Sequence, residues 1–75
     1  MNDWIVDKSA NASYYKLSDR PVAYSIEVAP LVVADYDDRG NVAGIELLTA
    51  ATDKYDIHNL IALAGKVPLE MRSPA

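Results

Sequence analysis

The stretch at residues 37–40, Asp-Asp-Arg-Gly, constrains the fold of this chain most, because it separates two largely apolar segments with the composition of a tight turn. Acidic residues favour a type I turn, and a glycine can adopt the left-handed conformation that closes a four-residue loop. The flanking segments, 31–36 and 42–48, are rich in aliphatic side chains. The sequence therefore predicts an antiparallel β-hairpin, with structural turn roles for Asp38 and Gly40.

Three more segments have the character of strands. Residues 22–28 alternate between large apolar side chains and small or polar ones, a period of two that marks a half-buried strand. Residues 4–6 and 12–17 are rich in aromatic or aliphatic side chains, and the polar stretch 7–11 connects them. Pro21 lacks the N–H that a sheet ladder needs, so it suits the position before a strand. We expect an antiparallel sheet of four to five strands built from hairpins.

The C-terminal part changes to a helical period. Apolar residues recur at the i, i+3, i+4 and i+7 spacing of one helix face, at Ile57, Leu60, Ile61 and Ala64. Thr52 or Asp53 is expected to cap the start of this helix, and Gly65 is expected to cap its end. We predict a single α+β domain over residues 1–66, with the helix packed on one face of the sheet, and a loose tail over residues 67–75.

The central strands look apolar on both sides. Residues 31–34 carry no polar side chain. In the next strand both alternating sets are largely apolar, Ala43, Ile45 and Leu47 on one side and Val42, Gly44 and Leu48 on the other. One helix can cover one face, and an antiparallel sheet with a wet face should alternate with polar residues. We therefore expect the second face to be buried in a two-fold homodimer. The alternative is a tightly curled sheet with the tail folded back over it.

Composition limits the partners of the chain. Seven basic and eleven acidic residues give a net charge of −4, and the basic residues are scattered. Direct binding of nucleic acid is therefore disfavoured, because phosphates would be repelled. An acidic surface suits a basic protein partner, although the charge can also serve solubility alone. No apolar run approaches the ~20 residues of a membrane span, and the N-terminus has no signal-peptide core. We expect a cytoplasmic protein with no membrane partner.

Carboxylates gather in and around the predicted hairpin, at Asp35, Asp37, Asp38 and Glu46. Their spacing partly matches a calcium-binding loop. That loop needs an oxygen ligand where Arg39 stands, and flanking helices where strands are predicted, so we expect neither a metal nor a cofactor. Glu46 lies inside an apolar run. We predict that it is buried and paired with Lys16 or Arg20, or exposed near a sheet edge.

The remaining side chains that could bind a ligand or take part in catalysis are tyrosines and one histidine. Tyr14, Tyr15 and Tyr24 lie on strands that we expect to be adjacent, where they could line a groove, pair across strands or anchor an interface. His58 lies off the apolar helix stripe and is expected on the surface. No serine stands in a nucleophile elbow and no phosphate-binding glycine loop occurs, so we assign no catalytic residue. The chain also has no cysteine.

Two stretches resemble motifs of the bacterial domain-of-unknown-function family 2283. Residues 6–17 resemble the first motif, although Val6 and Asn11 stand where tyrosine and aspartate are usual. Residues 32–50 are similar to the second, which reads Val-x-Asp-Tyr-Asp-x-x-Gly-x-x-x-Gly-Ile-Glu-Ile-Leu-x-Ala. The resemblance implies a small, mostly β domain with no established activity. It also implies an antitoxin-like role, because some members are thought to lie beside small toxin genes.

The positions that match the family motifs supply the candidate ligand-binding residues Asp7, Tyr14, Asp35, Asp37 and Glu46. Gly44 matches as well, where a glycine serves close strand packing. We expect a non-catalytic protein-interaction module, antitoxin-like and binding a basic partner. The alternative is a small enzyme or a ligand or metal binder that uses Asp35, Asp37 and Glu46 at a cleft between two subunits.

Overall fold

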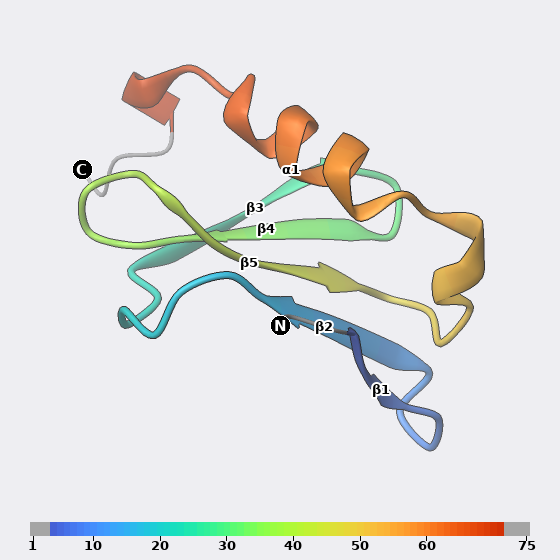
Figure 1. The fold of residues 1–75 in the computed structure, drawn as a ribbon. Coiled ribbons are helices and arrows are strands. Elements are labelled where there is room, and N and C mark those ends of the chain that lie inside the picture. Colours follow the sequence, from blue (N-terminus) through green and yellow to red (C-terminus); the bar gives the residue numbers. More distant parts are fainter. Residues whose placement is uncertain (1–3, 72–75) are drawn as a thin grey trace.

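The structure is a computed structural model and describes residues 4–71. Its five strands are β1 (Trp4–Asp7), β2 (Ala12–Lys16), β3 (Tyr24–Ala29), β4 (Val32–Tyr36) and β5 (Val42–Leu47). The helix α1 (Ile57–Gly65) follows, flanked by the short 3-10 helices η1 (Thr52–Lys54) and η2 (Leu69–Met71). One antiparallel sheet and one C-terminal helix confirm the predicted α+β fold (Figure 1).

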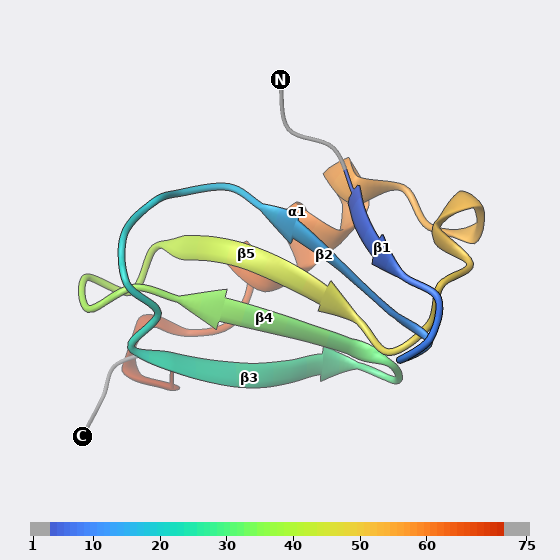
Figure 2. The same ribbon diagram turned by 90° about the horizontal axis from the view of Figure 1, so that it is seen from below.

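The sheet has the strand order β1-β2-β5-β4-β3, with every neighbouring pair antiparallel. Hairpins join β1 to β2, β3 to β4 and β4 to β5, while residues 17–23 carry the chain from β2 around the ends of β5 and β4 to the far edge (Figure 2). β5 is therefore the central strand. The expectation that the strands of Tyr14 and Tyr24 are adjacent is wrong, because β5 and β4 lie between them.

The hairpin between β4 and β5 has the predicted turn. Gly40 has a φ of 81°, which is in the left-handed region that favours glycine. Its N–H donates to the carbonyl of Asp37 at 3.1 Å, and the N–H of Asp37 donates to the carbonyl of Asn41 at 2.9 Å. These bonds close the loop and set the register of the two strands.

The helix covers one face of the sheet and buries an apolar core, made of Val32, Ala34, Tyr36, Ile45, Leu47, Leu60 and Ala64. The Tyr36 hydroxyl donates to the carbonyl of Ala64 at 2.9 Å, which ties β4 to the end of the helix. Two aromatic pairs extend this core across strands. Trp4 meets Tyr15 edge to face and Tyr24 stacks on Tyr36, each with ring centroids 5.2 Å apart.

The apolar residues of β5 divide between the faces differently from the prediction. The register shifts at Tyr36, which pairs with Val42, while Asp35 pairs with Gly44. Because Ala43 is the extra residue of this bulge, Val42 packs against the same core as Ile45 and Leu47. The prediction placed Val42 on the opposite face. That face keeps Gly44, as predicted, and carries Glu46 beside it, so it is less apolar than the sequence pattern indicated.

The helix ends also differ from expectation. Asp56, not Thr52 or Asp53, caps α1, and its carboxylate accepts from the N–H of His58 at 2.9 Å. Thr52 and Asp53 instead belong to η1, because the chain makes a separate short turn before the helix. Gly65 is the last helical residue, and Lys66, with a φ of −83°, caps the end without a left-handed residue. Of the expected tail, η2 is part of the structure and residues 72–75 lie outside the described residues.

Candidate functional site

The sheet face opposite the helix, turned toward the viewer in Figure 2, is called the open face. The strand register places most of the candidate residues on it. Residues paired directly across antiparallel strands share a face. The register therefore assigns to the open face Ile5, Asp7, Ala12, Tyr14, Lys16, Ser25, Glu27, Val33, Asp35, Gly44 and Glu46. One row of these residues crosses all the strands in spatial order: Ile5, Tyr14, Glu46, Val33 and Glu27.

The side chain of Tyr14, which starts on β2, extends over the central strand β5. A Cβ atom added at Gly44 would overlap the tyrosine ring, so the glycine provides the space in which the ring lies. The hydroxyl of Tyr14 is hydrogen-bonded to Asp35, and Asp35 also accepts from the Ser25 hydroxyl at 2.6 Å. We call Tyr14, Asp35 and Ser25 the Tyr14 cluster. It connects β2, β4 and β3 across the open face.

The environment of Tyr14 keeps its hydroxyl protonated. Partial burial is the largest cause, followed by the charge of Asp35 and the hydrogen bond to it, and together with the charge of Glu46 they raise the pKa of Tyr14 to about 12. At neutral pH the phenol is therefore a hydrogen-bond donor. General acid–base catalysis favours a group that titrates near the working pH, so this phenol is poorly suited to it.

A shallow depression of about 150 Å³ lies beside the tyrosine, between β1, β2 and β5. Its lining residues are Ile5, Asp7, Ala12, Ser13, Tyr14 and Glu46. The carboxylate of Asp7 accepts from the Ser9 hydroxyl at 2.7 Å and from the N–H of Ala10 at 3.2 Å. These two hydrogen bonds hold the pKa of Asp7 below its usual value, so this carboxylate is ionised at neutral pH.

Two basic side chains of the described residues, Lys16 and Arg20, form ion pairs, and neither pairs with Glu46. Lys16 pairs with Asp19 at 2.8 Å, and Arg20 pairs with Asp37 and Asp38 at 3.2 and 3.1 Å. The predicted pairing of Glu46 with Lys16 or Arg20 is therefore wrong. The other expectation, a position near a sheet edge, is wrong too, because β5 is central. Within residues 4–71, no ion pair joins a cation to the open-face carboxylates Asp7, Asp35 and Glu46.

Asp37 lies apart from these groups. Its side chain is only 2% exposed, and one carboxylate oxygen accepts from the N–H groups of Arg39 and Asn41 at 2.9 Å each. Burial opposes its ionisation, but these hydrogen bonds and the neighbouring Arg20 outweigh burial and hold the pKa of Asp37 below its usual value. Asp37 thus stabilises the turn and the segment that carries Arg20, while the side chain of Asp38 is 73% exposed beside it.

The structure therefore brings together Tyr14, Asp35 and Glu46 on the open face, and Asp7 is among the residues that line the depression. Ser25 belongs to the same cluster, and sequence reasoning missed it. In the sequence, Ser25 is marked only as a polar position in an alternating strand. Its hydrogen bond to Asp35 depends on the pairing of β3 with β4. Gly44 was expected in close strand packing, and its open-face side receives the Tyr14 ring.

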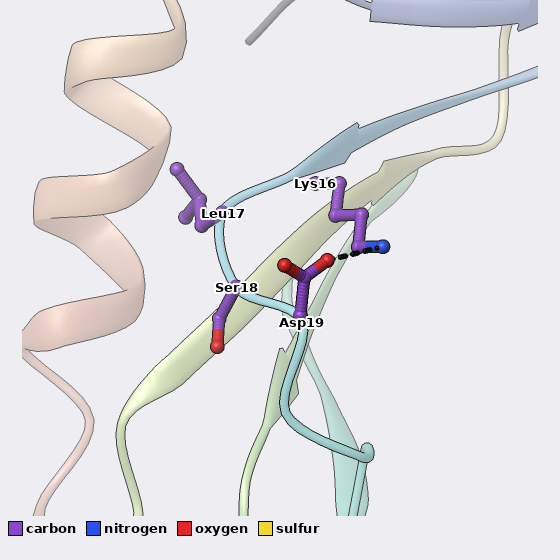
Figure 3. Close-up of a pocket in the computed structure, with 4 residues that line it drawn as sticks. All are labelled: Lys16, Leu17, Ser18 and Asp19. Carbon is purple, nitrogen blue, oxygen red and sulfur yellow. Dashed lines mark ion pairs between the residues drawn. The ribbon is translucent and has the colours of Figure 1, made fainter.

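A second depression, of about 90 Å³, is lined by Lys16, Leu17, Ser18 and Asp19. Figure 3 shows the ammonium group of Lys16 directed at the carboxylate of Asp19, with Leu17 on the other side of the chain. Because Lys16 is already paired with Asp19, the described residues that line this depression have no unpaired charge with which to bind a charged ligand. Over the described part of the chain, no three His, Cys, Asp or Glu side chains are grouped as metal ligands would be.

Comparison with known proteins places the chain in one family. No curated protein and no solved structure matches it. None of the described helices is both long and apolar enough to cross a membrane. A family whose description is "Protein of unknown function (DUF2283)" matches residues 5–50, a region that holds most of the sheet and the whole Tyr14 cluster but not α1. Since this match spans more than half of the 75 residues, the chain belongs to the DUF2283 family.

Proposed function

We propose that this protein is a non-catalytic protein-interaction module that binds a basic protein partner on the open face of its sheet. One observation carries the proposal. The open face presents Asp7, Asp35 and Glu46 without a cation from the described part of the same chain. Complementary charge from a partner would speed association and favour the correct partner over others.

The rest of the open face suits a protein surface better than a small-molecule pocket. Its depression is shallow, and polar side chains alternate there with exposed apolar ones such as Ile5, which is 65% exposed. Protein interfaces combine aromatic and aliphatic anchors with a polar rim, and tyrosine is enriched in them. The Tyr14 ring lies over Gly44 of the central strand and its hydroxyl is hydrogen-bonded to Asp35.

A second copy of this chain could occupy the open face instead of a basic partner, forming a two-fold homodimer. Exposed Ile5 would favour such a dimer. Two copies facing each other would, however, bring the carboxylates of Asp35 and Glu46 toward those of the partner, and like charges at an interface are costly. A basic partner removes that cost, so it has the stronger support.

Two further forms of the function have narrower support. An antitoxin-like role would make the partner a small basic toxin, and it rests on the toxin genes that the family resemblance implies. An enzyme or ligand binder that uses Asp35, Asp37 and Glu46 together has less support, because Asp37 is held inside the turn. We therefore favour binding without catalysis.

The test is capture of partners from a nuclease-treated lysate of the native host by the tagged chain and two variants. Asp35→Asn/Glu46→Gln removes two charges from the open face. Asp53→Asn/Glu70→Gln removes two exposed charges outside the sheet and is the matched control. We expect the wild type and the control to capture a stoichiometric basic protein, and the open-face variant to lose it. Circular dichroism melts check that each variant is folded.

Two results would contradict the proposal. One is a wild-type chain that captures no protein and only self-associates, which light scattering on the purified protein would detect. The other is a partner that the open-face variant retains as well as the control does. Binding should also weaken as salt rises, because exposed charges are screened within about 8 Å at physiological ionic strength.

A further inference from the structure

We infer that the depression between β1, β2 and β5 receives a single arginine side chain of the basic partner. This inference rests on the proposed function and names the group that the open face recognises. The depression, about 150 Å³, combines an apolar wall, an aromatic ring and two carboxylates. An arginine side chain matches all three, because it has an apolar stem and a flat, charged head.

The apolar wall comes from Ile5 and Ala12, on neighbouring strands. Ile5 is 65% exposed, which makes it one of the large hydrophobic residues most open to water in this chain. The methylene stem of an arginine would cover this surface. Contact of this kind removes apolar area from water and contributes about 25 cal/mol per Å².

The two carboxylates belong to Asp7 and Glu46, on β1 and on the central strand β5. Asp7 is held in place by the Ser9 hydroxyl and the Ala10 N–H. A guanidinium group has five donors in a planar fork and can reach two separate carboxylates, whereas a lysine ammonium is a compact point charge. The two acidic groups therefore favour arginine over lysine.

The aromatic ring is that of Tyr14, which is fixed by its neighbours. Gly44 leaves room beneath the ring, and the hydroxyl is held by Asp35. A guanidinium stacks on an aromatic face through cation–π attraction. A ring that is already fixed loses little freedom when the partner binds, and this lowers the cost of association.

The test uses two short, capped glycine-serine peptides that differ only in carrying one arginine or one lysine. Each peptide is titrated into the ¹⁵N-labelled full chain, and the amide shifts of Ile5, Tyr14 and Glu46 are followed. We expect saturable binding of the arginine peptide in the millimolar range, with the lysine peptide at least about 5-fold weaker.

Three variants locate the binding. Glu46→Gln removes one of the two carboxylates and should weaken arginine binding at least about 5-fold. Glu27→Gln is the matched control, because Glu27 lies in the same row of the open face but two strands away, roughly 10 Å by strand spacing. We expect it to change binding by less than about 2-fold. Tyr14→Leu should also weaken binding, and the dispersion of each amide spectrum checks the fold.

The outcomes separate this inference from the proposed function. If Glu46→Gln and Glu27→Gln weaken binding equally, or if arginine and lysine bind alike, the arginine site is wrong and the face binds basic groups diffusely. If neither peptide binds while the lysate experiment still yields an open-face partner, the arginine site is again wrong and the proposed function stands. Saturable arginine binding that depends on Glu46 and not on Glu27 supports the site.

Discussion

The two faces of this sheet are made by the same strands and differ in composition. On the helix side, Tyr36, Ile45 and Leu47 are fully buried with 0% exposure. On the open face, the residue between Ile45 and Leu47 is Glu46, and Gly44 precedes them. Strand residues alternate between faces, so each strand places one set of side chains in the core and the other set on the open face. The covered face therefore supplies the packing that stabilises the fold, whereas the open face presents carboxylates and the partly buried Tyr14.

The largest expected effect on the free energy of unfolding comes from making the same substitution, isoleucine to alanine, on each face of the sheet. Ile45→Ala removes a fully buried side chain from the core and should lower the free energy of unfolding by about 3 kcal/mol. Ile5→Ala removes the same atoms from a residue that is 65% exposed and should change it by less than about 0.5 kcal/mol. Urea unfolding followed by circular dichroism measures both. Equal losses would show that the open face is covered in solution, as a dimer requires.

A smaller effect on stability is expected when one tyrosine hydroxyl group is removed from each face. Tyr36→Phe removes a buried hydrogen bond to the carbonyl of Ala64 and should cost about 1–2 kcal/mol, because that carbonyl loses its side-chain donor. Tyr14→Phe removes a partly exposed hydrogen bond to Asp35, a group that water can then solvate, and should cost less than about 1 kcal/mol. Thermal unfolding of the two variants provides the measurement. A reversed order would mean that the open-face cluster is structural.

Local sequence rules predicted the parts of this fold that depend on neighbouring residues. The turn at residues 37–40 follows from the acidic residues and from Gly40, whose φ of 81° few other residues adopt readily. The helix follows from the apolar spacing that starts at Ile57. Its cap was misplaced, because several acidic or hydroxyl residues precede the helix and only the path of the chain selects Asp56.

The open face could not be predicted in the same way, because it depends on how strands pair. A single bulge residue, Ala43, moves Val42 to the helix side, and no local pattern indicates where a bulge will occur. The family motif marked Tyr14, Asp35 and Glu46. It also marked Asp37, which serves the turn. Ser25 was missed because its contact with Asp35 depends on a pairing between strands.

A third comparison tests the packing of the Tyr14 ring on Gly44, by making Gly44→Ala with and without the ring. In Gly44→Ala the new methyl group overlaps the ring, so the ring must move away from Asp35, and we expect a loss of about 1 kcal/mol. In a Tyr14→Ala background the space is empty, and Gly44→Ala should be neutral or slightly stabilising, because alanine is stiffer than glycine in a strand. A double-mutant cycle by urea unfolding measures the coupling. Additive effects would contradict the packing of the ring on Gly44.

The smallest expected effect is a loss of stability at alkaline pH that belongs to Tyr14. Its phenol has a pKa of about 12 in the folded chain, against an ordinary value near 10.0. The unfolded chain therefore releases this proton first, so the contribution to stability is complete below pH ~10 and is lost as pH rises toward ~12. Because the ring is partly open to water, we expect the loss to be at most about 1 kcal/mol.

A single unfolding curve at alkaline pH combines every contribution to stability, so the contribution of Tyr14 must be measured as a difference. The urea midpoint of the wild type minus that of Tyr14→Phe, followed from pH 9 to pH 12, isolates the contribution of Tyr14. The difference should be constant up to pH ~10 and then shrink, since phenylalanine has no proton to lose. In Gly44→Ala, where the ring is displaced from Asp35, the same difference should vary less with pH. A pH-independent difference in the wild type would mean that Tyr14 does not hold its proton against Asp35, and that the ring is not fixed on the open face.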